Sequence, residues 1–300
     1  LFRSSGTADD ASFQLSSELT QESSLIVTGL AKSHPKKPGV YEMDVHKIEL
    51  VQKAEANYPI SHKEHGPEHL MQNRHLWLRT PRQVAIARVR ASIVKAIRDF
   101  FDSRDFVLMD APILTPSACE GTSTLFSTDY FDETAYLTQS GQLYGEVGAM
   151  AFGKTYVFGP TFRAEKSKTR KHLTEFWMVE PEIAYWSLEE NMTLGEEFIV
   201  SIMKDVLSRN RSELQTLGRD ISALEAIAQG GFPRVHYNDC VDMLNKNGHP
   251  FQWGDDFGAP EETKIGNLFG DKPVWIHHFP KDIKSFYFKL DKNDPRYALG

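Results

Sequence analysis

Residues 156–185 read YVFGPTFRAEKSKTRKHLTEFWMVEPEIAY. Aromatic and β-branched residues at both ends predict two β-strands, the second running from Phe176 to Tyr185. The segment between them is a basic loop that contains Lys166, Lys168, Arg170, Lys171 and His172. This pattern is typical of a hairpin of two long strands joined by a cationic loop.

Side chains alternate along a strand, so each strand has two chemically different faces. Thr161, Arg163 and Glu165 share one face of the first strand, and one face of the second carries Phe176, Met178, Glu180 and Glu182. If these faces coincide, one surface offers a guanidinium, several carboxylates and an aromatic ring. A nucleoside triphosphate requires such a mixture, since the ring stacks on a base and the guanidinium holds a phosphate. A half-buried hairpin with a solvated basic tip is the simpler alternative.

The order of the residues favours a nucleotide-binding site over a hairpin with a solvated tip. Phe-Arg-Ala-Glu at 162–165, the basic loop, and Glu-Phe-Trp-Met-Val-Glu-Pro-Glu at 175–182 resemble motif 2 of class II aminoacyl-tRNA synthetases, most closely that of the asparaginyl members. The resemblance implies an α+β fold, with an antiparallel sheet flanked by helices. It also implies an ATP site with Arg163 as the catalytic residue on the α-phosphate, Glu165 on the adenine amine, His172 among the phosphate-binding cations and Phe176 stacked on adenine.

Two further segments resemble amino-acid-binding parts of these enzymes. Glu120, in a small-residue loop at 117–126, matches a glutamate that holds the substrate α-ammonium, although a solvated turn is the alternative. Gln-Ser-Gly-Gln-Leu-Tyr-Gly at 139–145 resembles the Gln-Ser-Pro-Gln-Leu-aromatic-Lys segment of aspartyl enzymes, which implies that Ser140 and Gln142 contact the amino acid.

The last position of that segment, residue 145, distinguishes asparaginyl from aspartyl enzymes. Gly145 stands where aspartyl enzymes carry a lysine for the substrate β-carboxylate. A neutral amide needs no such cation, and the resemblance implies that Glu180 accepts the amide N–H. A carboxylate there also repels aspartate. We therefore expect an asparaginyl enzyme.

The remaining segments predict the domain organisation. Residues 84–104 are an amphipathic helix, followed by a strand at 106–109 and by Pro112, and this order resembles motif 1, which implies a homodimer. Ser187 and Glu190 predict a capping box that opens a second long helix. Residues 272–280 and 283–290 predict two more strands of the antiparallel sheet. We expect a partial OB-fold β-barrel for anticodon binding at 1–58, a hinge at 59–82, and a class II catalytic domain at 83–300.

Metal sites are not predicted within the chain. Four histidines lie in the expected hinge, but Gly66 and Pro67 interrupt any helix that would align two of them, so we expect no metal there. Motif 3 and the acidic residues that hold Mg²⁺ in the family are expected beyond Gly300.

The composition is that of an ordinary globular enzyme. Hydrophobic residues make up 40% and charged residues 25% of 300 residues, and the net charge of -7 disfavours a protein that binds nucleic acid over its whole surface. Two cysteines are too few for a disulfide framework, so we expect a cytoplasmic protein, and no apolar run is long enough for a membrane helix.

The resemblance implies ATP-dependent activation of L-asparagine to asparaginyl-adenylate and transfer to tRNA(Asn). Three alternatives remain: an aspartyl-tRNA synthetase, a paralogue that activates the β-carboxylate of aspartate and adds ammonia, and a non-catalytic binding module with the same fold.

Overall fold

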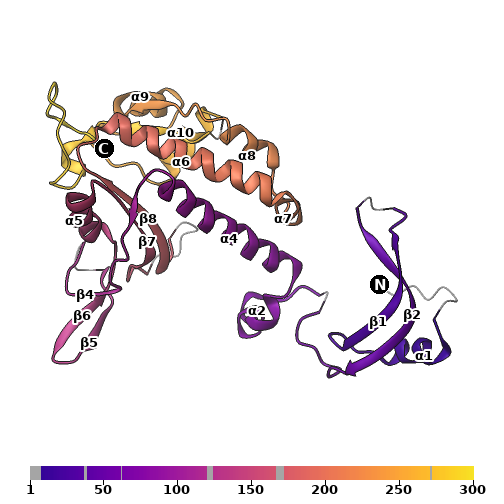
Figure 1. Ribbon diagram of the computed structural model, residues 1–300. Helices are drawn as coiled ribbons and strands as arrows, with labels where there is room; N and C mark the ends of the chain where they lie inside the picture. The colour runs from indigo at the N-terminus through magenta and orange to yellow at the C-terminus, as the bar shows by residue number, and fades with distance from the viewer. Residues whose placement is uncertain (1–7, 37–38, 62, 120–123, 167–171, 271) are drawn as a thin grey trace. The chain divides into compact units, whose positions relative to one another are not determined.

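The computed structural model describes residues 8–36, 39–61, 63–119, 124–166, 172–270 and 272–300. The chain divides into two compact units, Leu1–Val84 and Ala85–Gly300, with α4 (Pro81–Asp102) beginning in the first and continuing in the second. Figure 1 traces the elements of both units. Within the described residues, no helix is both long and apolar enough to cross a membrane.

The first unit is built on one antiparallel strand pair. Its elements are α1 (Asp10–Glu18), β1 (Ser24–Ser33), β2 (Tyr41–Gln52), α2 (Pro67–Gln72) and α3 (Arg74–Trp77). The buried Ser12 hydroxyl on α1 accepts a hydrogen bond of 2.8 Å from the Ile48 N–H on β2, which fixes the helix against the strands. Within the segment expected to be the hinge, Pro67 occupies the first turn of α2, where its missing N–H costs nothing.

The second unit is organised around a sheet of three strands in the order β3–β7–β8. These are β3 (Val107–Leu108), β7 (Lys154–Phe162) and β8 (Glu175–Ile183). The strands β7 and β8 pair antiparallel as predicted, but β3 runs parallel to β7, so the sheet is mixed. The chain reaches β7 from β3 through a long connection that includes α5 (Gln142–Phe152), and parallel neighbours require such a crossover.

One face of this sheet packs on the main hydrophobic core. Tyr156 and Phe158 on β7 meet residues of α4 and α6 (Leu188–Arg209), among them Phe101, whose ring stacks on that of Tyr156 at 4.6 Å. The Tyr156 hydroxyl donates a hydrogen bond of 2.9 Å to Asp102, which satisfies its one polar group. The amphipathic helix is confirmed, although its apolar residue Ile86, near the helix start, is 40% exposed.

The opposite face of the sheet is covered in part by α5. Three glycines allow this helix and the turn before it to approach the strands closely: a Cβ on Gly141, Gly145 or Gly148 would lie between 2.4 and 3.1 Å from side-chain atoms beneath it. The α5 segment therefore forms one wall of the sheet face that carries Thr161 and Phe176.

The other elements surround this centre. A second sheet consists of β4 (Leu114–Thr115), β6 (Glu133–Leu137) and β5 (Ser127–Tyr130). The remaining helices are α7 (Arg211–Thr216), α8 (Ile221–Ile227), α9 (Tyr237–Lys246) and α10 (Ala259–Leu268). Parallel strands β9 (Arg234–His236) and β10 (Trp275–His277) pair, as do antiparallel strands β11 (Phe279–Pro280) and β12 (Tyr297–Ala298), with the 3₁₀ helix η2 (Lys281–Ile283) after β11.

The prediction for the C-terminal strands was wrong. The segment 283–290 was expected to be a strand of the main sheet, but it forms η2 and turns, with one isolated bridge between Leu290 and Ala298. Its run of aromatic residues, Phe286, Tyr287 and Phe288, fits a strand, yet a strand exists only where a partner satisfies its backbone. The segment 272–280 forms the short β10 and β11 in separate small sheets, and His278 between them has a left-handed φ of 59°.

We predict that Ser187→Ala destabilises the second unit. Ser187 is the N-cap of α6 and forms the predicted capping box with Glu190. Its loss lowers the free energy of unfolding by about 1 kcal/mol. Chemical denaturation measures this change, and the matched control is Ser208→Ala on the exposed side of the same helix, expected within about 0.5 kcal/mol of the unchanged protein. Equal effects of the two changes would contradict the assignment of the cap.

Candidate functional site

The pairing of β7 and β8 brings the two predicted faces together. Thr161 lies opposite Phe176, Val157 opposite Glu180, and Thr155 opposite Glu182. Directly opposed residues in an antiparallel pair point to the same side. Phe176, Glu180 and Glu182 therefore lie on one face, away from the main core.

Arg163 and Phe176 form one end of this site. The guanidinium carbon of Arg163 lies 5.4 Å from the centroid of the Phe176 ring, within the range of a cation–π contact. The Arg163 backbone N–H donates to the Thr174 carbonyl at 3.0 Å, which extends the strand pairing beyond Phe162. Both side chains are half-buried. The arrangement offers a flat aromatic surface beside a fixed cation.

Glu180, Ser140 and Gln142 form the other end. The Ser140 hydroxyl donates to Oε1 of Glu180, and the Gly141 N–H donates to Oε2 at 2.9 Å. The Ser140 hydroxyl also accepts from the Gln142 N–H at 3.0 Å, at the start of α5. Glu180 thus fixes the turn at 140–142 against β8. Along β8 the two ends are separated by four residues, or about 13 Å.

The turn is also attached to β7 and to the loop before β5. The Phe162 N–H donates to the Thr138 carbonyl and the Ala164 N–H to the Thr124 carbonyl, both at 2.8 Å. The buried Gln139 side chain donates to the Thr124 hydroxyl at 2.7 Å. These bonds hold the backbone on both sides of the site in place.

The structure does not join every predicted residue to these two groups. Glu165 and His172 are exposed and lie on either side of residues 167–171, which are outside the described residues together with the loop cations they contain. Glu120 also lies outside the described residues. Cys119, directly before it, lies 3.7 Å from the side-chain oxygen of Gln142.

Sequence reasoning assigned no role to Glu182, which the structure places beside Glu180. Burial, Glu146 and Glu180 together raise the pKa of Glu182 to about 7. Its place on the face of Phe176 and Glu180 was predictable from alternation. Its burial was not, because it depends on how α5 packs over β8.

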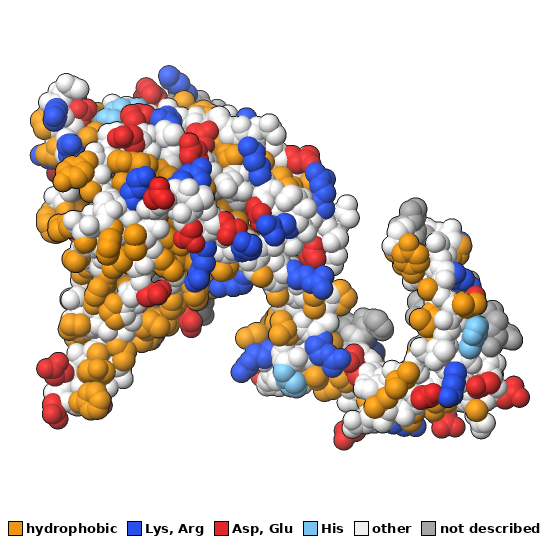
Figure 2. Space-filling view, in the orientation of Figure 1, with side chains coloured by type: hydrophobic (Ala, Val, Ile, Leu, Met, Phe, Trp, Pro, Cys, Tyr) orange, Lys and Arg blue, Asp and Glu red, His pale blue; other side chains and the backbone are white. Residues whose placement is uncertain are grey.

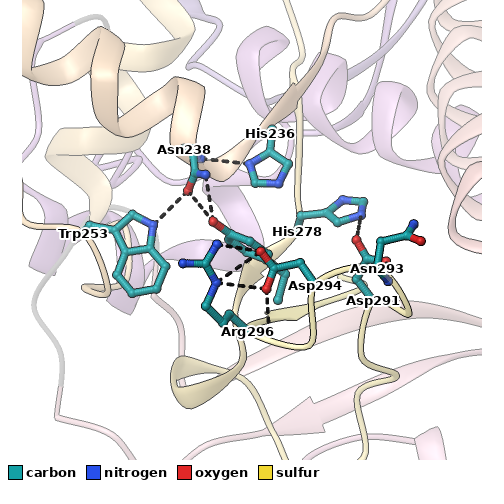
Figure 3. A network of polar contacts seen from close by, with 9 residues as sticks. His236, Asn238, Trp253, His278, Asp291, Asn293, Asp294 and Arg296 are labelled. Carbon is teal, nitrogen blue, oxygen red and sulfur yellow. Dashed lines mark hydrogen bonds and ion pairs between the residues drawn. The ribbon is translucent and has the colours of Figure 1, made fainter.

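A second polar cluster lies in the C-terminal part of this unit (Figure 3). The Nδ1 atom of His236 accepts a hydrogen bond of 3.1 Å from the Asn238 N–H at the start of α9, and its ring stacks on His278 at 5.2 Å. Burial and His278 lower the pKa of His236, and the neutral ring is the form that can accept at Nδ1. The Asn238 amide donates to the Tyr297 hydroxyl at 2.8 Å, so the cluster joins β9, α9 and β12.

The described residues do not form a magnesium site. Within the part of the chain that the structure describes, no group of three or more histidine, cysteine, aspartate or glutamate side chains is arranged to hold a metal ion.

Known proteins resemble the chain over most of its length. The family model of class II tRNA synthetases (D, K and N) matches residues 66–299. A relative from Desulforamulus reducens, named asparagine–tRNA ligase, is 55% identical over 96% of this chain. The chain spans 66% of that relative, slightly less than two thirds of its length.

Solved structures show the same fold. The asparaginyl-tRNA synthetase of Pyrococcus horikoshii, complexed with asparaginyl-adenylate, superposes with a TM-score of 0.89 at 38% identity, covering 98% of this chain and 68% of the other. An aspartyl-tRNA synthetase from Entamoeba histolytica superposes with a TM-score of 0.80 at 26% identity, covering 98% and 64%. These similarities confirm the predicted α+β class.

We predict that Glu182→Gln stabilises the protein at alkaline pH. The folded state holds the Glu182 proton up to a pKa of about 7, whereas the unfolded chain releases it near 4.5. The folded state binds more protons in this window, so stability present below pH 4.5 is lost as pH rises through 7. Glutamine removes this loss, giving a gain of about 1 kcal/mol at alkaline pH after a discount for solvent screening.

Urea unfolding at mildly acidic and mildly alkaline pH measures the difference. The matched control is Glu133→Gln, which replaces an exposed carboxylate on β6 and is expected to change the free energy of unfolding by less than about 0.5 kcal/mol. A gain from Glu182→Gln that does not depend on pH would contradict the assigned ionisation.

Proposed function

The chain belongs to the class II tRNA synthetases (D, K and N), and we propose that its activity is that of an asparagine–tRNA ligase. The observation that carries the proposal is the common sheet face on which β7 and β8 place Arg163 and Phe176 at one end and Glu180 at the other. The identity of 55% to an asparagine–tRNA ligase supports the choice of amino acid. We further propose that the protein acts in the cytoplasm.

ATP is assigned to the Arg163 end of the site. Phe176 stacks on adenine, Glu165 accepts a hydrogen bond from its exocyclic amine, and Arg163 binds the α-phosphate. His172 and the neighbouring loop cations meet the outer phosphates. The close contact between the guanidinium and the Phe176 ring supports this assignment, because it sets a phosphate-binding group beside the base-stacking surface.

Asparagine is assigned to the Glu180 end. Glu180 accepts the side-chain amide N–H, Ser140 and Gln142 contact the amino acid, and Glu120 holds the α-ammonium. Each carboxylate oxygen of Glu180 already accepts one hydrogen bond from the turn, but each has a second lone pair available for a ligand. The carboxylate is thus oriented before the ligand binds.

The first step forms the adenylate. The α-carboxylate of asparagine attacks the α-phosphorus of ATP, a mixed anhydride forms, and the bond to the leaving pyrophosphate breaks. Arg163 stabilises the charge that develops on the phosphate oxygens, and the two ends of the site align the reacting anions. In the second step a terminal hydroxyl of tRNA(Asn) attacks the activated carbonyl, and AMP leaves.

The domain boundaries remain part of the proposal. We assign residues 1–58 to a partial OB-fold that binds the anticodon, 59–82 to a hinge and 83–300 to the catalytic domain. The β1–β2 pair and the division of the chain at Val84 support this assignment.

We predict that Arg163→Ala lowers the asparagine-dependent exchange of pyrophosphate into ATP by about 10²- to 10³-fold in the full-length protein. Phe176→Ala raises the KM for ATP by about tenfold, because a base-stacking surface is lost. Phe131→Leu, at a site that is 90% exposed, is the control and leaves the exchange unchanged. Exchange that depends on aspartate instead of asparagine would contradict the proposal, as would failure of the unsubstituted protein to bind ATP and asparagine.

We also propose a homodimer through the motif 1 region. Ile113 and Leu114, which directly follow Pro112, are 46% and 43% exposed, and Figure 2 shows hydrophobic side chains gathered over the adjoining β4, β5 and β6. Exposed apolar surface of this kind is typical of a protein interface.

We predict that Ile113→Asp weakens this dimer, because the partner would have to bury an unpaired charge. Light scattering after size exclusion measures the shift towards monomer. The control is Leu268→Asp on α10, a site with 39% exposure outside the motif 1 region. A dimer that responds equally to both changes, or to neither, would contradict the assigned interface.

A further inference from the structure

A histidine cluster lies where β9 and β10 end, and it consists of His236, His277 and His278. The rings of His236 and His278 stack at 5.2 Å, and the ring of His277 meets them at 5.8 Å and 4.7 Å. All three residues are half-buried. His278 has a left-handed φ of 59°, and its ring points towards Asp291 (Figure 3). Three imidazole rings are thus in mutual contact and partly shielded from solvent.

The contacts within the cluster limit the number of protons that it can hold. Nδ1 of His277 and Nδ1 of His278 lie 2.5 Å apart, so one must donate and the other accept. Nδ1 of His236 accepts from the Asn238 N–H at 3.1 Å, so it carries no proton. Nε2 of His278 lies 3.6 Å from the carboxylate of Asp291, which gives one imidazolium an ionic partner. The folded cluster therefore accommodates one positive charge, whereas three charged rings would set N–H groups against each other.

The other charged groups around the cluster are mostly acidic. His236 and His277 face carboxylates from several parts of the second unit: Asp239 on α9, Glu189 on α6, and Asp291 and Asp294 before β12. Arg296 pairs with Asp294 at 2.6 Å and neutralises part of this charge. Burial and the neighbouring histidines outweigh the carboxylates and lower the pKa of both His236 and His277.

The cluster helps to attach the segment 279–298 to β9 and α9. The Tyr297 ring lies edge-on to His236 at 4.9 Å, and its hydroxyl accepts a hydrogen bond of 2.8 Å from the Asn238 side chain. At the other end of the segment, Phe279 packs on Tyr237 at 5.5 Å. β11 and β12 pair with each other, and most residues between them are at least partly exposed. The base of the segment is therefore the part that fixes it to the fold.

We propose that the histidine cluster is an acid-sensitive switch, which holds the segment 279–298 on β9 and α9 while at most one ring is charged and releases the segment when further protons bind. Release separates the N–H groups that would face each other and hydrates the charged rings. Lys289 in this segment lines a cavity with Glu182 and Ile183, so release also uncovers the end of β8.

The switch acts below about pH 6.5, the ordinary pKa of a hydrated histidine. The pKa values of His236 and His277 are lowered in the closed form, so below this pH the closed form binds fewer protons than the open form. The stability of the closed form is therefore fully present above pH 6.5 and is lost as the pH falls. Because closure excludes two of three protons, the equilibrium constant for opening is expected to rise by more than about tenfold per pH unit between about pH 6 and pH 5.

Hydrogen–deuterium exchange of the full-length protein, read by mass spectrometry and corrected for the pH dependence of intrinsic exchange, measures this opening. His236→Asn keeps an acceptor at the N-cap of α9 and removes one titrating ring. His278→Asn also removes a ring and introduces a residue that tolerates a left-handed φ. Each variant is expected to reduce the dependence to about tenfold per pH unit or less. His75→Gln, an exposed site on α3, is the control and leaves the dependence unchanged.

The switch predicts a loss of protection in 279–298 that is steeper than tenfold per pH unit and that precedes any loss in β7 and α6. Equal protection at neutral and acidic pH, a shallower dependence, or simultaneous loss in β7 and α6 overturns it. A dependence that both variants leave unchanged overturns it as well. If His236→Asn does not fold, His278→Asn decides by the same readout. No substrate or activity enters this measurement, so its failure leaves the proposed function untouched.

Discussion

The register between β7 and β8 is the constraint on which the site depends. Thr161 opposite Phe176 and Val157 opposite Glu180 place the ring and the carboxylate on one face, and Arg163 continues the same alternation past the end of β7. A slip of one residue would turn every one of these groups towards the core. The alternate residues Tyr156 and Phe158 are buried among α4 and α6, and burying them favours only one register. The hydrophobic core therefore determines which side chains reach the functional face.

The two faces of the sheet are packed by side chains of different size. The core face is filled with large rings, of which Phe101 stacks on Tyr156. The functional face meets α5 through glycines, so the helix backbone approaches the strand closely enough to bury part of Glu182. Close packing with glycine gives a wall without side chains that would fill the space between helix and sheet. The close packing of α5 on β8 thus contributes to the burial that raises the pKa of Glu182.

The sequence predicted most of what depends on local pattern. Alternation identified the shared face, Ser187 with Glu190 identified the start of α6, and the resemblance to motif 2 identified the family. Prediction from the sequence failed where the local structure depends on contacts with residues far away in the chain. The segment 283–290 has the composition of a strand but pairs only at Leu290. Gly145 was interpreted as the loss of a positive charge, and only the packing of α5 on β8 revealed that it also makes room for Glu182.

The Glu180 end of the site carries an electrostatic cost. Glu146, Glu180 and Glu182 converge, and the mutual repulsion raises the pKa of Glu182, which means that the folded state disfavours its charge. A site selected only for stability would place a cation or an apolar residue there. The core formed by α4, α6 and β7 offsets this cost, since its aromatic residues are almost completely buried. The repulsion is therefore a property of the folded chain itself and exists before any ligand binds.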